Sequence, residues 1–93
     1  MDRDEAAKLL GRHLERVGRE PFDSLSSMVG NPRVTPALGH SGVEYQIEVE
    51  AMWDDESNGV LRVLGSIDDA TFRGAFSPVT DDFLITRDGP VDI

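Results

Sequence analysis

The sequence predicts an α+β domain in which an N-terminal amphipathic helix and a short second helix pack on one face of a three- to four-stranded antiparallel β-meander. Two observations carry this prediction. Nonpolar residues recur at three- and four-residue steps over residues 3–17, and they alternate with polar residues over residues 43–53. A chain of 93 residues has no room for a second core, so we expect residues 1–93 to form a single domain.

The first helix is predicted from its nonpolar stripe and from its two ends. Asp2 and Glu5 have the spacing of a capping box, and Gly18 and Pro21 mark the end. A short helix over residues 23–29 follows. The stripe of the first helix consists of Ala6, Leu9, Leu10, His13, Leu14 and Val17.

The first long strand is predicted over residues 43–53, where the odd positions are nonpolar and most even positions are Glu or Gln. Such alternation buries one side of a strand and leaves the other side in water. Asn58 and Gly59 predict a turn, so residues 60–67 are expected to return as the second strand of a hairpin.

The hairpin register is predicted from its nonpolar rows, with a small contribution from one charge pair. Both rows then share one face, which the first helix is expected to cover. The predicted partners are Ala51 with Leu61, Val49 with Val63 and Glu50 with Arg62.

Three further segments complete the predicted order. Residues 72–77 are expected to form the third strand, with Phe72 beside Ile67, Gly74 beside Gly65 and Phe76 beside Val63. The Gly65–Gly74 pair would leave room for a bulky residue of the helix. Residues 83–86 are a possible edge strand, and residues 31–42 are expected to be a loop with a short extended piece near Val34.

Charge narrows the class of partner. The net charge is -9, and residues 1–20 contribute none of it because their five acidic residues balance five basic ones. An acidic surface repels phosphates, so we expect no binding to nucleic acid or to anionic membranes. The chain has no cysteine, no secretory leader pattern and no long nonpolar run, and it is therefore predicted to be soluble and cytoplasmic.

The solvent side of the sheet is the leading candidate for a binding surface. Its acidic row and a few nonpolar residues, among them Val60 and Ala75, resemble a protein interaction site, although scattered nonpolar residues are also normal on a sheet. We expect a non-enzymatic binding module, such as an adaptor, an inhibitor or a chaperone-like protein, for a basic or mixed-charge protein partner. A homodimer through the same face is an alternative. The candidate residues are Glu44, Gln46, Glu48, Glu50, Met52, Arg62, Leu64 and Arg73.

A divalent-cation site of the Ca²⁺ type is the second hypothesis. Successive turns of a meander alternate between the two ends of a sheet, so two acidic segments are expected to meet at one end. An EF-hand is excluded because position 12 of the loop that starts at Asp54 is Gly65. Asp residues also favour turns for conformational reasons alone. The candidate ligands are Asp54, Asp55, Glu56, Asp81 and Asp82.

Catalytic motifs are absent from the sequence, so an enzyme is only a residual possibility and no cofactor is expected. The segment Gly39-His40-Ser41-Gly42-Val43 lacks the final glycine of a nucleophile elbow and precedes a strand. His13 is expected to be a core or boundary residue, and His40 a loop residue. Trp53 is expected to pack at the rim of the core.

Overall fold

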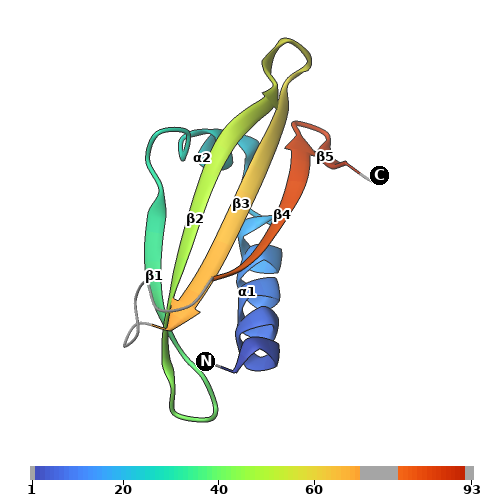
Figure 1. Cartoon of the computed structure of the whole chain (residues 1–93). Coiled ribbons are helices and arrows are strands. Elements are labelled where there is room, and N and C mark those ends of the chain that lie inside the picture. Colours follow the sequence, from blue (N-terminus) through green and yellow to red (C-terminus); the bar gives the residue numbers. More distant parts are fainter. Residues whose placement is uncertain (1, 70–77, 92–93) are drawn as a thin grey trace.

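The computed structural model describes residues 2–69 and 78–91. The described chain forms one antiparallel sheet of five strands in the order β1-β2-β3-β4-β5 (Figure 1), which confirms the predicted α+β fold and its meander. The elements in chain order are α1 (Arg3–Val17), α2 (Phe22–Ser26), β1 (Arg33–Leu38), β2 (Glu44–Asp55), the 3-10 turn η1 (Glu56–Asn58), β3 (Val60–Asp69), β4 (Val79–Thr86) and β5 (Gly89–Pro90).

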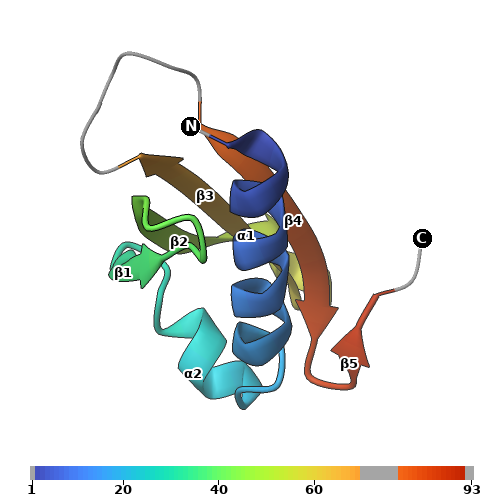
Figure 2. The same ribbon diagram turned by 90° about the horizontal axis from the view of Figure 1, so that it is seen from below.

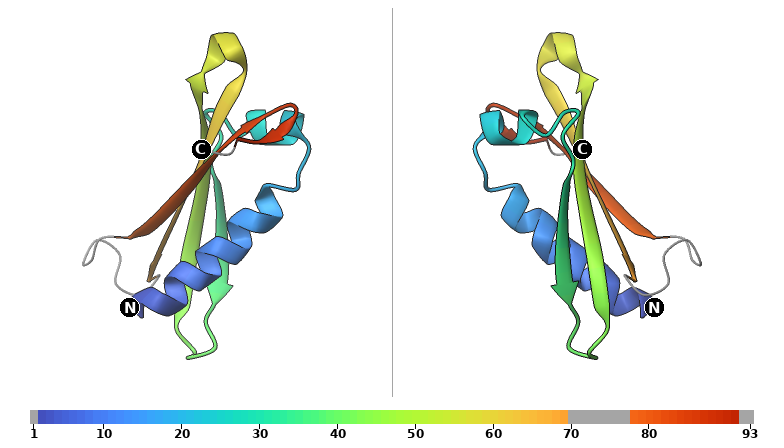
Figure 3. Two further views of the ribbon diagram at one scale, coloured as in Figure 1. Left: turned by 90° about the vertical axis from the view of Figure 1, so that its right-hand side faces the viewer. Right: turned by 90° about the vertical axis from the view of Figure 1, so that its left-hand side faces the viewer.

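The molecule has two layers. Both helices lie on the same face of the curled sheet (Figure 2), and in the side views no helix of the described chain covers the opposite face (Figure 3). Helix α1 packs chiefly over β3 and β4, and α2 contacts β2. The buried core between the layers includes Leu10 and Leu14 of α1 together with Ile47 and Val63 of the sheet.

Helix α1 begins and ends where the sequence predicts. The carboxylate of Asp2 accepts a hydrogen bond from the Glu5 N–H at 3.1 Å, which satisfies one of the free N–H groups of the first turn. Gly18 caps the C-terminus. The predicted stripe is buried at four positions, Ala6, Leu10, Leu14 and Val17, whereas His13 is only partly buried.

Gly65 allows the closest approach of α1 to the sheet. A Cβ atom at this position would lie 2.9 Å from Cδ1 of Leu10 and 2.9 Å from Cδ2 of Leu14. The missing side chain therefore makes the space that the two leucines occupy, as the sequence predicts for Gly65.

The β2–β3 register differs by two residues from the predicted one. Ala51 pairs with Val63 and Glu50 with Leu64, so the Glu50–Arg62 pair is wrong, although every side chain keeps its predicted face. A shift of two preserves the alternation, so the nonpolar rows fit both registers equally well. The turn decides between them, because a bulge between Trp53 and Asp55 precedes η1.

The strand beside β3 is β4, which begins after Pro78. Ile67 pairs with Val79, Gly65 with Asp81 and Val63 with Phe83, so the predicted pairs of β3 with residues 72–77 are wrong. The predicted strand at 72–77, including Arg73, lies outside the described residues. Residues 83–86, predicted as an edge strand, form the second half of β4.

The predicted loop at residues 31–42 contains the six-residue strand β1. The sequence pattern did not predict β1 as a strand, because two prolines lie near Val34 and proline is uncommon inside strands. At an edge, however, a proline is tolerated when its nitrogen points away from the neighbouring strand. The second helix is also shorter than predicted and ends at Ser26.

The rim of the core is closed by an aromatic pair. Trp53 is half-buried, as predicted, and its ring lies 6.2 Å from that of Phe22 at the start of α2. The guanidinium of Arg87 stacks on the other ring of this pair, 4.9 Å from the Phe22 centroid. These contacts join α2 to the ends of β2 and β4.

Candidate functional site

The sheet surface opposite α1, called the open face below, carries the candidate binding residues. Because paired residues of neighbouring antiparallel strands share a face, the pairing of the described strands defines this surface. Seven of the eight predicted binding residues lie on it, and Arg73 lies outside the described residues. Short of the bulge after Trp53, the pairing places on it Val34, Pro36, Leu38, Glu44, Gln46, Glu48, Glu50, Met52, Arg62, Leu64, Ser66, Asp68, Thr80, Asp82 and Leu84. The hydrogen bonds from Arg62 place Asp54 beside them, and it is counted as a member.

A nonpolar stripe runs along β1 on the open face. It consists of Val34, Pro36 and Leu38, of which Val34 is 53% and Leu38 67% exposed. Met52 on β2 is 39% exposed and extends the nonpolar surface elsewhere on the face. Side chains of this size are costly to leave in water, and their grouping on one surface is typical of an interaction site.

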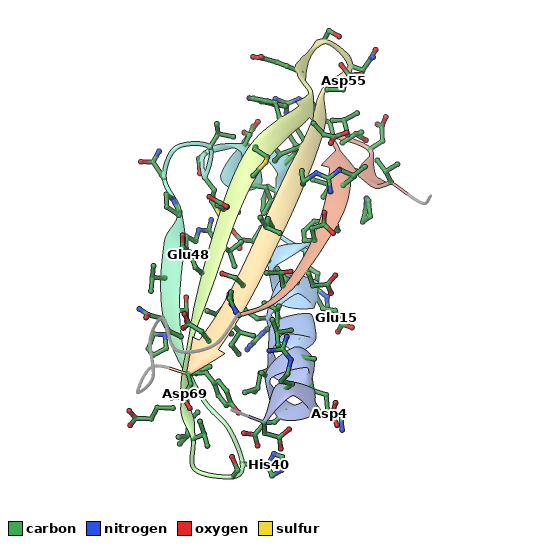
Figure 4. The ribbon with its side chains drawn as sticks, in the orientation of Figure 1. Asp4, Glu15, His40, Glu48, Asp55 and Asp69 are labelled. Carbon is green, nitrogen blue, oxygen red and sulfur yellow. The ribbon has the colours of Figure 1, made fainter. Side chains whose placement is uncertain are left out.

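An acidic row on β2 lies directly beside this stripe. Leu38 pairs with Glu44 and Val34 pairs with Glu48, so the nonpolar and acidic side chains are cross-strand neighbours. Figure 4 shows Glu48 on the β1–β2 side of the sheet, on the face turned toward the viewer. The stripe and the row therefore form one composite surface.

The only described cation of the open face is already neutralised. Arg62 donates to the carboxylate of Asp54, with Nη2 2.9 Å and Nε 3.3 Å from Oδ1, and its Nη1 bonds Asp82 from the other side. The two carboxylates raise the pKa of the Arg62 guanidinium, Asp54 having the larger effect. Six carboxylates against this one guanidinium leave five negative charges on the described part of the face.

A shallow hollow lies in the middle of the open face. Its volume is about 270 Å³, and it is lined by Val34, Gln46, Glu48, Ser66 and Asp68 from three adjacent strands. A side chain of a partner that enters it meets both carboxylates and a nonpolar wall. The hollow therefore favours a long side chain with a nonpolar stem and a cationic end.

The five predicted cation ligands do not gather into one site, and only Asp54 and Asp82 meet, on either side of Arg62. Asp81 and Asp82 lie within β4, opposite Gly65 and Leu64, and not in a turn at the end of the sheet. Asp55 lies in the projecting hairpin (Figure 4) and accepts bonds from Ser57 and Asn58. Within residues 2–69 and 78–91, no group of three or more Asp, Glu, His or Cys side chains is arranged to hold a metal ion.

Asp54 and Asp82 form ion pairs with Arg62, and Glu56 lies exposed in η1. The acidic pairs thus have local partners. Hydrogen bonds from Asn58 and Ser57 lower the pKa of Asp55, which fits a turn cap that is ionised at neutral pH. These contacts account for the Asp residues without a bound cation.

The free edge of β1 is interrupted by Pro36. The Gly39 N–H bonds the Val43 carbonyl at 2.9 Å, which makes them a hydrogen-bonded pair of the β1–β2 ladder. Because such pairs alternate along antiparallel strands, the even residues of β1 direct their backbone groups away from β2. The central one of these is Pro36, which has no N–H to donate.

The outer edge of β4 pairs with β5 only at its C-terminal end, and the part before that pairing is blocked in a different way. The Val91 N–H bonds the Leu84 carbonyl at 2.9 Å, so the even residues of β4 direct their backbone groups away from β3. The N–H of Asp82 is among them, and it bonds the side chain of its neighbour Asp81 at 2.9 Å. Proline and charge at an edge are recognised devices against the pairing of strands between molecules.

A buried carboxylate at the other end of the sheet was missed from the sequence. Glu5, which the sequence assigned only to helix capping, has a side chain that is 3% exposed. It accepts hydrogen bonds from Ser41 Oγ at 2.6 Å, from Ser41 N–H at 3.1 Å and from Tyr45 OH at 2.9 Å. The ring of His40 is exposed, but its Nδ1 lies 2.9 Å from Glu5 Oε2 beside the start of α1 (Figure 4).

The Glu5 cluster fits a structural role. The hydrogen bond from the Ser41 hydroxyl is the main cause that lowers the pKa of Glu5, and bonds from Tyr45 and the Ser41 N–H and the nearby His40 add to it against the opposing effect of burial. A carboxylate with a lowered pKa is a weaker base, which favours the role of a hydrogen-bond acceptor over that of a general base for Ser41. Burial and the Glu5 contact raise the pKa of Tyr45 to about 12.

A second carboxylate anchors the opposite end of β1. The carboxylate of Glu20, between α1 and α2, accepts hydrogen bonds from both terminal nitrogens of Arg33 at 2.7 and 2.9 Å and from the Ser24 hydroxyl at 2.6 Å. These bonds, led by those from Arg33, lower the pKa of Glu20. Together with Glu5, which holds the loop after β1, this pair ties the strand that carries the nonpolar stripe to the helical layer.

Comparison of the chain with known protein families, with curated proteins and with solved structures finds no match. Over the described part of the chain, no helix has the combination of length and nonpolar character that crossing a membrane requires. The residues of the open face are therefore the basis of a functional argument.

Proposed function

We propose that this chain is a non-enzymatic protein-binding module that binds a basic partner through the open face. One observation carries the proposal: a sheet surface that no described helix covers combines an exposed nonpolar stripe with a net charge of five negative units among its described residues. Nonpolar contact supplies affinity, and the electric field of the carboxylates speeds encounter with a cationic surface.

The anchoring of β1 supports this role. A binding surface loses affinity when its residues must be ordered on contact. Strand β1 is an edge strand, yet Glu5 and Glu20 hold the chain at its two ends through short hydrogen bonds. The nonpolar stripe is thus presented on a strand that is fixed before the partner arrives.

The partner is expected in the cytoplasm, because the chain has no cysteine and relies on its packed core for stability. A cation-binding function is not proposed, since the candidate ligands Asp54, Asp55, Asp81 and Asp82 each have a hydrogen-bond partner in the chain. An enzymatic function is not proposed either, since the buried Glu5 is a hydrogen-bonded anchor.

Affinity capture with charge variants tests the proposal. The wild-type chain is immobilised and exposed to extract of its native cells at low and at high salt, beside a variant with Glu44→Gln, Glu48→Gln and Glu50→Gln. A control variant removes the same number of charges away from the open face, at three exposed residues, with Glu15→Gln, Glu56→Gln and Asp88→Asn.

We expect the wild type and the control to retain a basic protein at low salt and to release it at high salt, because salt screens exposed charges. The face variant should retain much less of it. Capture of nothing at either salt, or equal capture by the face variant, contradicts the proposed function.

A further inference from the structure

We propose that the partner docks as a basic amphipathic α-helix lying along β1 and β2 on the open face, and not as an added strand at an edge of the sheet. This inference rests on the proposed function and specifies the chemistry and the geometry of the partner.

The edges of the sheet argue against strand addition. A peptide that extends a sheet needs a run of outward N–H and C=O groups on the edge strand. On β1 that run is broken at its centre by Pro36, and on β4 the Asp82 N–H is occupied by the Asp81 carboxylate. Side-chain contacts on the open face are therefore the available mode of binding.

The spacing of the stripe fits a helix. Val34, Pro36 and Leu38 are two residues apart in a strand, which places successive side chains about 7 Å apart and the outer two about 14 Å apart. Nonpolar residues at positions i, i+4 and i+8 of a helix are spaced by about 6 Å and span about 12 Å. A helix of about three turns parallel to β1 thus aligns three nonpolar side chains with the stripe.

The neighbouring acidic row determines the charge of that helix. The row begins one strand away, about 5 Å from the stripe. Lys or Arg residues on one flank of the docked helix can reach Glu44, Glu48 and Glu50 while the nonpolar residues stay on β1. The expected partner therefore repeats a nonpolar residue every fourth position with a basic residue beside each.

A second copy of this chain is a poorer occupant. Its open face carries the same excess of negative charge, so two open faces repel each other. Its helix α1 exposes basic residues such as Lys8, Arg12 and Arg16, but the nonpolar stripe of that helix is buried in its own core. The second copy thus lacks a helix that is both basic and nonpolar on one side.

Two synthetic peptides of identical Leu, Lys and Ala composition test the mode of docking. One places Leu at every fourth position so that it forms an amphipathic helix, and the other alternates Leu and Lys so that it favours a strand. Binding to the intact ¹⁵N-labelled protein is followed by calorimetry and by amide chemical shifts. The double variant Val34→Thr with Leu38→Thr removes the stripe, and Val91→Thr removes an exposed nonpolar side chain elsewhere.

We expect the helical peptide to bind at least tenfold more tightly than the alternating one, with shifts confined to β1, β2 and the middle of β3. The double variant should weaken it at least tenfold, and Val91→Thr should leave it unchanged. Thermal unfolding of each variant shows that the fold is retained.

Tighter binding of the alternating peptide, or shifts along an outer edge of β1 or β4, overturns helical docking and leaves the proposed function intact. Helical docking is also overturned if both peptides bind equally and the double variant does not weaken either, because charge alone then explains the affinity. If neither peptide binds while the capture experiment succeeds, helical docking alone is refuted. If the capture experiment also fails, the proposed function falls with it. Self-association through the open face in sedimentation identifies a second copy as the occupant and overturns the inference.

Discussion

Substitution of Gly65 by alanine tests how closely α1 packs on the sheet. The new Cβ would lie 2.9 Å from a methyl group of Leu10 and from one of Leu14, both buried. Carbon atoms prefer about 3.5–4.0 Å, so both leucines must move by about 0.6–1 Å. Overpacking of this kind lowers the free energy of unfolding by about 1–3 kcal/mol, and the lower entropy of the unfolded alanine chain raises it by about 0.4–1 kcal/mol. We expect Gly65→Ala to lower the free energy of unfolding by about 1–2 kcal/mol.

The matched control is Gly11→Ala on α1, where a Cβ would meet no atom within 4 Å. Alanine there should stabilise the helix by about 0.5–1 kcal/mol, so the two glycine substitutions have opposite signs. Urea unfolding followed by the fluorescence of Trp53, the single tryptophan, gives both values. In thermal unfolding, Gly65→Ala should lower Tm by about 5–15 °C for a domain of this size.

A coupled variant separates overpacking from other effects. Leu14→Ala removes one of the two crowded side chains, so it should cost less in the Gly65→Ala background than in the wild type. Additive losses would mean that the two residues do not touch. A Gly65→Ala chain as stable as the wild type refutes the close approach of α1 to β3.

Three further predictions concern the buried carboxylate and the sheet edge. Folding lowers the pKa of Glu5 from 4.5, so the ionised carboxylate stabilises the fold above pH 4.5, and this stabilisation is lost as the pH falls through the lowered value. The variant Glu5→Gln should therefore be less stable at neutral pH, and its urea midpoint should depend less on acid pH. Folding raises the pKa of Tyr45, the only tyrosine, from 10.0 to about 12, so the stabilisation from its neutral hydroxyl is complete below pH 10.0 and is lost toward pH 12. Tyrosinate absorbance should therefore rise near pH 12 in the folded chain, and a full rise at pH 10.0 would contradict the burial of Tyr45. Pro36→Thr restores an outward N–H on β1 and should produce concentration-dependent dimers in sedimentation, whereas Val34→Thr, which leaves the backbone unchanged, should not.

Local patterns predicted the parts of the fold that depend on single elements. Helix α1 and the inward and outward sides of β2 follow from periodicity over neighbouring residues. The partner of β3 and the register of the hairpin did not follow, since both depend on which segments meet in space. Two segments after β3 had compatible patterns, and a bulge beside Trp53 shifted the register without changing either face.

The sequence likewise predicted some residues of the candidate site and missed others. Glu48 and Arg62 were placed on the correct face by alternation alone. The nonpolar stripe was missed because Pro36 broke the pattern of β1. The burial of Glu5 had no signal in the helix pattern, since its position lies off the stripe of Ala6 and Leu10; the loop that carries Ser41 covers it from 36 residues away.

The two anchors of β1 also affect how the molecule opens. An edge strand that pairs with a single neighbour is ordinarily among the first parts to exchange its amide hydrogens. Here Glu5 and Glu20 attach the ends of β1 to α1 and to the segment after it, so release of the strand requires the loss of charged hydrogen bonds in both layers. The amides of β1 should therefore exchange together with those of α1, as one cooperative unit. A partner that binds the nonpolar stripe would then slow hydrogen exchange at the far side of the molecule, in a helix that it never touches.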